Sequence, residues 1–221
     1  GFSKRDFKLI HLDRQDNFSK ATFRYISKDL EEGFPGDLTL DVSYQLNIDG
    51  SLDITHEAFS TKDTLCNITN HAYFNFNQKN TTIYDHVIKI NASSYLDIDQ
   101  DNIIKSKSSV KDTAFDFRKN ISFKDAIDQM KDTSFEGFDH TWLFDSNNKD
   151  DIKAIVYDPK SKIGLNLYTT YPAVVLYSHN TTCCKPISLH PTAIPGSIPT
   201  YITHSPDCDW KGERPATNGT S

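Results

Sequence analysis

The chain has 221 residues, 37% hydrophobic and 24% charged, so we expect a folded protein with a sizeable core rather than a disordered one. The net charge is -6 and only five of the 24 basic residues are arginine, which argues against a nucleic-acid partner. No apolar run is long enough to span a bilayer, so no membrane partner is expected.

The cysteines give no sign of a disulfide framework or a metal site. Cys66, Cys183, Cys184 and Cys208 are mostly far apart, unlike the dense pattern of small secreted scaffolds. No Cys-x-x-Cys pair is present to begin a zinc site. We therefore expect no metal and a cytoplasmic location.

Alternating apolar residues predict a hairpin in the first quarter of the chain, after a candidate strand at Thr22–Ser27. From Asp37 to Asn47, positions 38, 40, 42, 44 and 46 are Leu, Leu, Val, Tyr and Leu, with mostly polar residues between them. This is the pattern of a half-buried antiparallel strand. The turn Asn47–Gly50 ends in Asp-Gly, and the run Ser51–Phe59 alternates again.

Short strands continue through the rest of the chain, with one short helical window at Phe123–Met130 and a Pro- and Gly-containing turn at Tyr157–Gly164. Periodicity is weak from Cys183 onward, so no strand is placed there. This pattern predicts a single all-β sandwich or barrel over residues 1–221. The further candidate strands are Leu65–Phe76, His86–Ala92, His140–Phe144, Ile152–Tyr157 and Leu165–Tyr177.

One polar cluster is the stretch "ITNHAYFNF", Ile68–Phe76, which carries no charged residue. On a strand, His71, Tyr73 and Asn75 would share one face. A histidine between aromatic walls can move a proton to or from a substrate oxygen near neutral pH. A core histidine bonded to backbone has the same pattern, so spacing alone does not decide its role.

Two further clusters lie downstream. In "EGFDHTWLF", Glu136–Phe144, the Asp139 carboxylate could accept hydrogen bonds from two adjacent sugar hydroxyls, or could cap a local turn. In "ISLHPTAIPG", His190 follows a short apolar run and precedes a proline, so it is either a site residue at a strand end or a surface histidine.

The residues together resemble the aldose 1-epimerase (galactose mutarotase) family. The resemblance rests on motifs in the expected order, and Asn-His-x-Tyr-Phe-Asn together with Gly-Phe-Asp-His is specific at this spacing. It runs from about Phe2 to about Asn180 and continues more weakly to the end. The motifs are "EEGFPGDLTLDVSYQL", "NITNHAYFNF", "DHVIKINASSYLDID", "AFDFRK", "GFDHTWLF" and "LYTTYPAVVLYSHN".

The resemblance implies a large antiparallel β-sandwich with a sugar cleft, and interconversion of the α and β anomers of free hexoses such as galactose and glucose. A base removes the proton of the anomeric hydroxyl, a histidine protonates the ring oxygen, and the opened ring recloses. His71 matches the acid, Asp139 matches the carboxylate that grips hydroxyls, and Asn70 and Tyr73 are further expected substrate contacts. No cofactor is required, and we expect a monomer or a homodimer.

Three departures from the family set up a competing hypothesis. The family's glutamate base corresponds to His190, and its substrate-binding glutamine corresponds to Val175. An N-terminal segment of the family, with sugar ligands and strands, would precede Phe2; a sandwich without it would expose edges and core. The alternative is therefore a non-catalytic or vestigial sugar-binding relative.

Epimerisation of hexose 6-phosphates is a third possibility. It is disfavoured because no arginine lies between Arg118 and Arg214, and phosphate usually recruits arginine.

Overall fold

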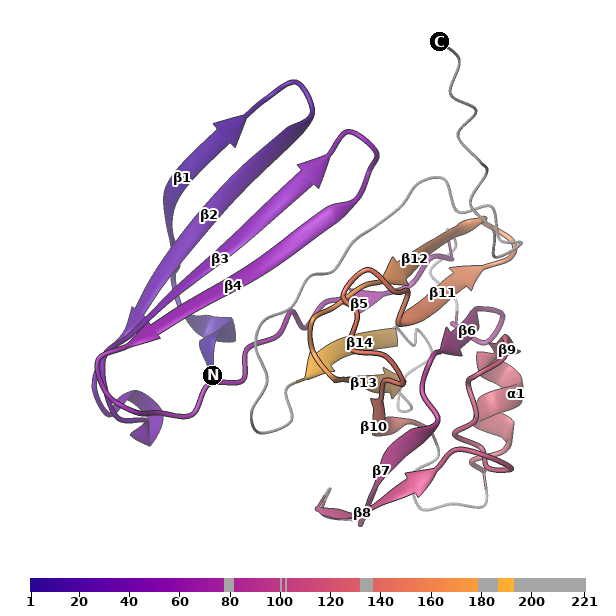
Figure 1. Ribbon diagram of the computed structural model, residues 1–221. Helices are drawn as coiled ribbons and strands as arrows, with labels where there is room; N and C mark the ends of the chain where they lie inside the picture. The colour runs from indigo at the N-terminus through magenta and orange to yellow at the C-terminus, as the bar shows by residue number, and fades with distance from the viewer. Residues whose placement is uncertain (78–81, 100, 102, 132–136, 179–186, 193–221) are drawn as a thin grey trace.

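The computed structural model describes residues 1–77, 82–99, 101, 103–131, 137–178 and 187–192, except the side chain of residue 190. Within these ranges the chain folds into three sheets, of strand orders β1-β2-β3-β4, β5-β14-β13-β10-β7-β8 and β12-β11-β6-β9 (Figure 1). Every strand pair described is antiparallel. This confirms the predicted all-β class.

The regular elements are short except in the first sheet. In chain order they are η1 (Phe2–Lys4), β1 (Lys8–Arg14), β2 (Phe18–Ser27), η2 (Glu31–Gly33), β3 (Leu38–Asn47), β4 (Leu52–Ser60), β5 (Tyr73–Phe74), β6 (Val87–Ile90), β7 (Ser94–Ile98), β8 (Ile104–Ser109), β9 (Ile121–Ser122), α1 (Phe123–Asp128), β10 (Asp139–Leu143), β11 (Ala154–Asp158), β12 (Ile163–Leu167), β13 (Ala173–Ser178) and β14 (Ile187–Thr192).

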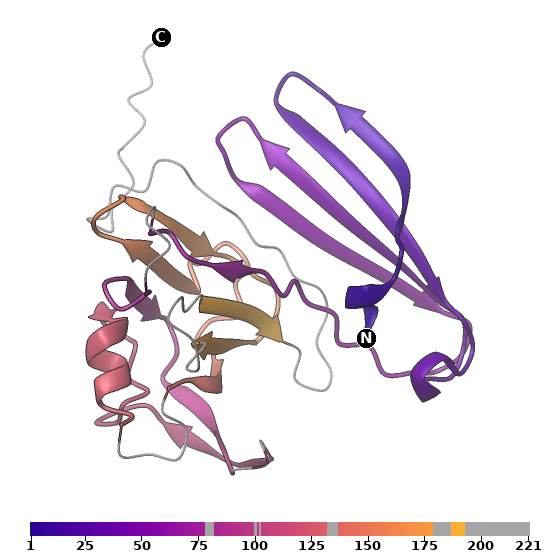
Figure 2. The ribbon, with the colours of Figure 1, turned by 180° about the vertical axis from the view of Figure 1, so that it is seen from behind.

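The predicted hairpin is confirmed as β3 and β4, paired from Leu38 with Ser60 to Leu46 with Leu52. Its turn closes through the Gly50 amide, which donates to the Asn47 carbonyl at 2.9 Å. Gly50 has φ +80°, a left-handed conformation that glycine adopts without strain. The four long strands form a fan on one side of the other two sheets (Figures 1 and 2).

The first sheet leaves apolar surface exposed. Leu12 on β1 is 70% exposed, Leu46 on β3 is 56% exposed and Phe59 on β4 is 72% exposed. Leu40, Val42 and Ile54 of the same sheet are instead buried in the core cluster. The first sheet therefore divides its apolar residues between the core and the surface.

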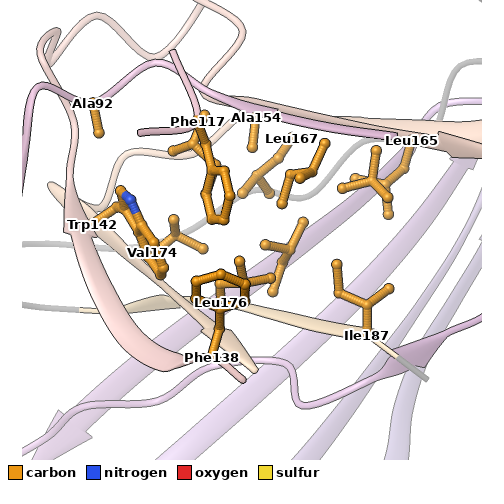
Figure 3. Close-up of a cluster of buried hydrophobic side chains, with 14 of the residues drawn as sticks. Ala92, Phe117, Phe138, Trp142, Ala154, Leu165, Leu167, Val174, Leu176 and Ile187 are labelled. Carbon is orange, nitrogen blue, oxygen red and sulfur yellow. The ribbon is translucent and has the colours of Figure 1, made fainter. Parts of the chain in front are cut away.

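The core lies between the six-stranded sheet and the sheet of β12, β11, β6 and β9 (Figure 3). Trp142 of β10 and Leu176 of β13 point toward Ala154 and Leu165 from the facing sheet, and all four are at most 2% exposed. Alternate residues of β10 and β13 enter this core, which leaves the opposite face of the same strands free for a site.

The helix is confirmed as α1, whose N-terminus is capped by the Ser122 hydroxyl accepting from the Asp125 amide at 3.1 Å. The run Leu165–Tyr177 divides into β12 and β13, because a turn interrupts it. In this turn the Tyr171 amide donates to the Thr169 hydroxyl at 3.0 Å.

Among the described residues, no helix is long and apolar enough to cross a membrane.

Candidate active site

The sequence-predicted residues meet on the face of the six-stranded sheet opposite the core. The register places Asp139 of β10 beside Tyr177 of β13, Tyr177 beside Ser188 of β14, and Ser188 beside Tyr73 of β5. Four strands therefore contribute one row of residues, although their positions are far apart in the sequence.

A pocket of about 340 Å³ opens over this row. It contains three of the predicted site residues, His71, Tyr73 and Asp139, and its other lining residues are Thr69, Val175, Tyr177 and Thr192. The lining offers hydroxyls, one imidazole, one carboxylate and one apolar side chain. Within the described part of the chain it includes no lysine or arginine.

His71 and Asp139 are electrostatic neighbours in this pocket. Both side chains reach solvent. Partial desolvation by the surrounding protein raises the pKa of the Asp139 carboxyl above its usual value, and the nearby His71 imidazole acts in the opposite direction. An acid–base group and a hydrogen-bond acceptor thus face the same small volume.

Two tyrosines form the aromatic side of the pocket. The rings of Tyr73 and Tyr177 meet edge to face with centroids 6.2 Å apart, and the His71 ring lies 5.3 Å from the Tyr73 ring. Burial is the main cause that raises the pKa of the Tyr177 phenol, and the nearby Tyr73 and Asp139 side chains raise it further. The Tyr177 hydroxyl therefore remains a donor at neutral pH. Aromatic faces with hydroxyl donors suit a sugar ring, which presents both C–H and O–H groups.

The segment that carries His71 differs from the predicted strand. Only Tyr73–Phe74 pairs as a strand, with β14. The Asn70 side-chain oxygen accepts from the Ala72 amide at 3.0 Å, and the Asn75 side-chain oxygen accepts from the Asn77 amide at 2.9 Å. Such local bonds compete with ladder pairing, so the expectation of a strand over Leu65–Phe76 was wrong.

Asn70 lies beside the pocket but is not one of its lining residues. Its carboxamide takes part in the turn that precedes β5. Its expected contact with substrate remains a prediction.

His190 lies on β14, where its backbone pairs with Val175, a lining residue. Its side chain is outside the described residues, so the expected role as base remains a prediction. The strand itself, in a region where periodicity placed none, continues the sheet between β13 and β5.

The Asp139–His140 pair is divided between the two faces of β10. His140 is 1% exposed and packs against Phe115, with ring centroids 4.7 Å apart. Burial lowers the pKa of His140 to about 4, so the imidazole is neutral at pH 7. His140 is therefore a core residue, and Asp139 faces the pocket.

A second histidine, His86, is also structural. Its ring is fully buried, and Nε2 accepts from the Phe76 amide at 3.0 Å. The adjacent Asp85 instead pairs with Lys160. His86 directly precedes β6, which forms within the predicted strand at His86–Ala92.

Sequence reasoning did not identify Thr69, Tyr177 or Thr192 as lining residues. Tyr177 has a local signal, since it alternates with Val175 on β13, whereas the threonines depend on chain segments meeting in space.

Among the described residues, no group of His, Cys, Asp or Glu is arranged to hold a metal ion.

A larger surface hollow of about 810 Å³ lies elsewhere and contains none of the predicted site residues. Two of its charged lining residues pair with each other, since Arg118 donates to Asp116 through two nitrogens at 2.8 and 2.6 Å. The smaller pocket is therefore the better candidate for chemistry.

Comparison with known proteins agrees with this architecture. The family model described as aldose 1-epimerase matches residues 1–218. The aldose 1-epimerase of Escherichia coli (strain K12) is 31% identical over 215 residues, covering 96% of this chain and 57% of that protein. The galactose mutarotase of Homo sapiens is 36% identical over 160 residues, covering 72% of this chain and 46% of that protein.

Solved structures show the same fold. A galactose 1-epimerase from Lactobacillus acidophilus NCFM has a TM-score of 0.77 at 23% identity, covering 90% of this chain and 65% of that chain. An aldose epimerase homologue from C. elegans has a TM-score of 0.75 at 22% identity, covering 91% and 68%. The chain spans about half the length of the curated relatives it matches. With a galactose mutarotase-like β-sandwich fold, it belongs to the aldose 1-epimerase family.

Proposed function

We propose that the protein is an aldose 1-epimerase that interconverts the α and β anomers of free hexoses such as galactose and glucose. The observation that carries the proposal is the pocket in which His71 and Asp139 face one another beside two tyrosines. Binding a neutral monosaccharide and opening its ring require acid–base groups, hydrogen-bonding groups and aromatic faces of this kind, and no cofactor.

In the proposed reaction His71, as an imidazolium, donates a proton to the ring oxygen while a base takes the proton of the anomeric hydroxyl. The bond between C1 and the ring oxygen breaks, giving the open-chain aldehyde. Rotation about the C1–C2 bond and reversal of the two proton transfers give the other anomer. The sum consumes and releases nothing, so acid–base groups suffice.

His190 is the proposed base, and a neutral imidazole can accept a proton near pH 7. Asp139 would accept hydrogen bonds from two sugar hydroxyls, and Tyr73 would cover one face of the ring. Asn70 is proposed as a further ligand, reached by a change in the turn before β5. The expected monomer or homodimer and the cytoplasmic location are likewise proposals.

The lining distinguishes between substrate classes. A hexose 6-phosphate carries a dianion that usually recruits arginine or lysine, and the described lining of the pocket has neither. A free sugar therefore suits the pocket better. Adding galactose 6-phosphate as a competitor should leave the rate with galactose unchanged.

A sugar-binding relative without catalysis is the second candidate. It is favoured by Val175, whose apolar side chain lines the pocket next to position 190. Polarimetry with fresh α-galactose or α-glucose separates the candidates. An epimerase speeds the approach to anomeric equilibrium above the buffer rate, whereas a sugar-binding protein leaves that rate unchanged and still binds the sugar.

A further inference from the structure

The segment that carries His71 has little regular structure to hold it in place. Only Tyr73 and Phe74 pair as a strand, yet the proposed reaction requires the His71 imidazole to keep a fixed position relative to Asp139 of β10. The fold needs other restraints on this backbone, because a displacement of about 1 Å can cost a catalytic group about 100-fold in rate.

Three buried side chains from other parts of the chain supply such restraints. The Tyr171 hydroxyl donates to the Ile68 carbonyl at 2.7 Å, and His86 accepts from the Phe76 amide at 3.0 Å. Between these two ends, the Ser188 hydroxyl donates to the Ala72 carbonyl at 2.8 Å. The third bond lies closest to His71, since Ala72 directly follows it in the chain.

Ser188 is also the residue that joins the two halves of the pocket. It is fully buried and is not one of the lining residues. Its backbone pairs with Tyr177 on one side, and Tyr177 pairs with Asp139; on the other side it pairs with Tyr73. Ser188 therefore lies in the same sheet as Asp139, and its side chain binds the backbone beside His71.

We propose that Ser188 is a positioning residue: its hydroxyl holds the Ala72 carbonyl and so keeps His71 opposite Asp139. The expected effect on the rate rests on the proposed epimerase function. The expected effect on the positions of His71 and Asp139 rests on the geometry alone. Since Ser188 does not line the pocket, its loss should act on the reaction step more than on sugar binding.

The test compares Ser188→Ala with Ser43→Ala in the full chain. Ser43 on β3 is a matched control, because it too is a buried strand serine with a 2.8 Å hydrogen bond, to Thr22, on a sheet that contributes no lining residue. Ser188→Ala should lower kcat about 10- to 100-fold with KM within about twofold of the wild type, as expected for a displaced catalytic group. Ser43→Ala should change kcat by no more than about twofold.

A second readout does not depend on activity. The titration of the Asp139 carboxyl is followed by carbon NMR in the wild type and in His71→Ala, Ser188→Ala and Ser43→Ala. Removing His71 removes a charge that lowers the pKa of Asp139, so His71→Ala should raise it. The other ionisable groups of the described lining are the phenols of Tyr73 and Tyr177, which all variants keep. Ser188→Ala should shift the titration the same way, and Ser43→Ala should not.

The outcomes separate the two proposals. If the wild-type chain shows no rate above buffer, the proposed function fails, and the Asp139 titration still decides the role of Ser188. If Ser188→Ala resembles Ser43→Ala in kcat and in titration, the positioning role is wrong.

Should Ser188→Ala fail to fold, Ser188→Thr and Ser188→Val replace it. These two variants add nearly the same volume and differ in the hydroxyl, so only the threonine should keep the wild-type titration. Equal titrations in the two would overturn the proposal.

Discussion

Acid should destabilise this protein through His140, a neutral imidazole in the core. Burial lowers its pKa from the usual 6.5 to about 4. The unfolded chain therefore binds a proton more readily than the folded one below pH 6.5. The stabilising contribution is complete above pH 6.5 and is lost as the pH falls toward 4.

The expected size follows from linkage. The gap between 6.5 and about 4, at about 1.4 kcal/mol per pH unit, corresponds to about 3 kcal/mol when the titration is complete. Between pH 7 and pH 5 the same relation gives a loss of about 2 kcal/mol in the free energy of unfolding. That is a large share of the stability of an ordinary domain.

The assay is urea unfolding from pH 7 to pH 5 of the wild type and of His140→Phe. Phenylalanine keeps an aromatic ring next to Phe115 and cannot be protonated. His56, His86 and the carboxyl groups titrate in both proteins, so the difference between the two slopes isolates His140. The wild type should lose about 2 kcal/mol more than the variant over this range. Parallel losses would refute the neutral, buried state of His140.

Three further substitutions test the pocket and the core. Asp139→Asn should raise KM for galactose about 10- to 100-fold in initial-rate kinetics, since hydrogen bonds to a charged group are worth about 1.5–3 kcal/mol; an unchanged KM would contradict its role. Tyr73→Ala should raise KM about three- to tenfold, while Tyr73→Phe keeps the ring and stays near the wild type. Leu176→Ala, at a fully buried position, should cost about 2–5 kcal/mol in urea unfolding, whereas Leu12→Ala, at a position 70% exposed, should cost less than about 0.5 kcal/mol; equal costs would contradict the assigned core.

The sheet class and the first hairpin could be predicted from sequence because their signals are local. Residues Leu38–Asn47 alternate strictly, and Asp49–Gly50 supplies the turn. The strand β1 was missed, and its register with β2 shifts between Leu9 and His11, an irregularity that breaks simple alternation. The strand β14 was missed because it depends on non-local pairing with β13 and β5.

The pocket could be predicted only in part. His71 and Asp139 were singled out by residue type and by resemblance to a family, since nothing in their spacing brings them together. Their proximity arises from the row that crosses β10, β13, β14 and β5. Tyr177 could have been found from its alternation with Val175 on β13, whereas Thr69 and Thr192 join the pocket only through tertiary pairing. The segment around His71 was predicted as a strand from its residue types, but local asparagine bonds compete with strand pairing there.

Polarimetry of fresh α-galactose tests the central claim most directly, in dilute buffer with the wild type, His71→Ala and Ser43→Ala at equal concentrations. We expect the wild type and Ser43→Ala to speed mutarotation above the buffer rate, and His71→Ala to lose about 100-fold or more, as for the removal of a general acid. A wild-type rate equal to buffer would contradict the epimerase function, and an undiminished rate in His71→Ala would contradict the assigned acid.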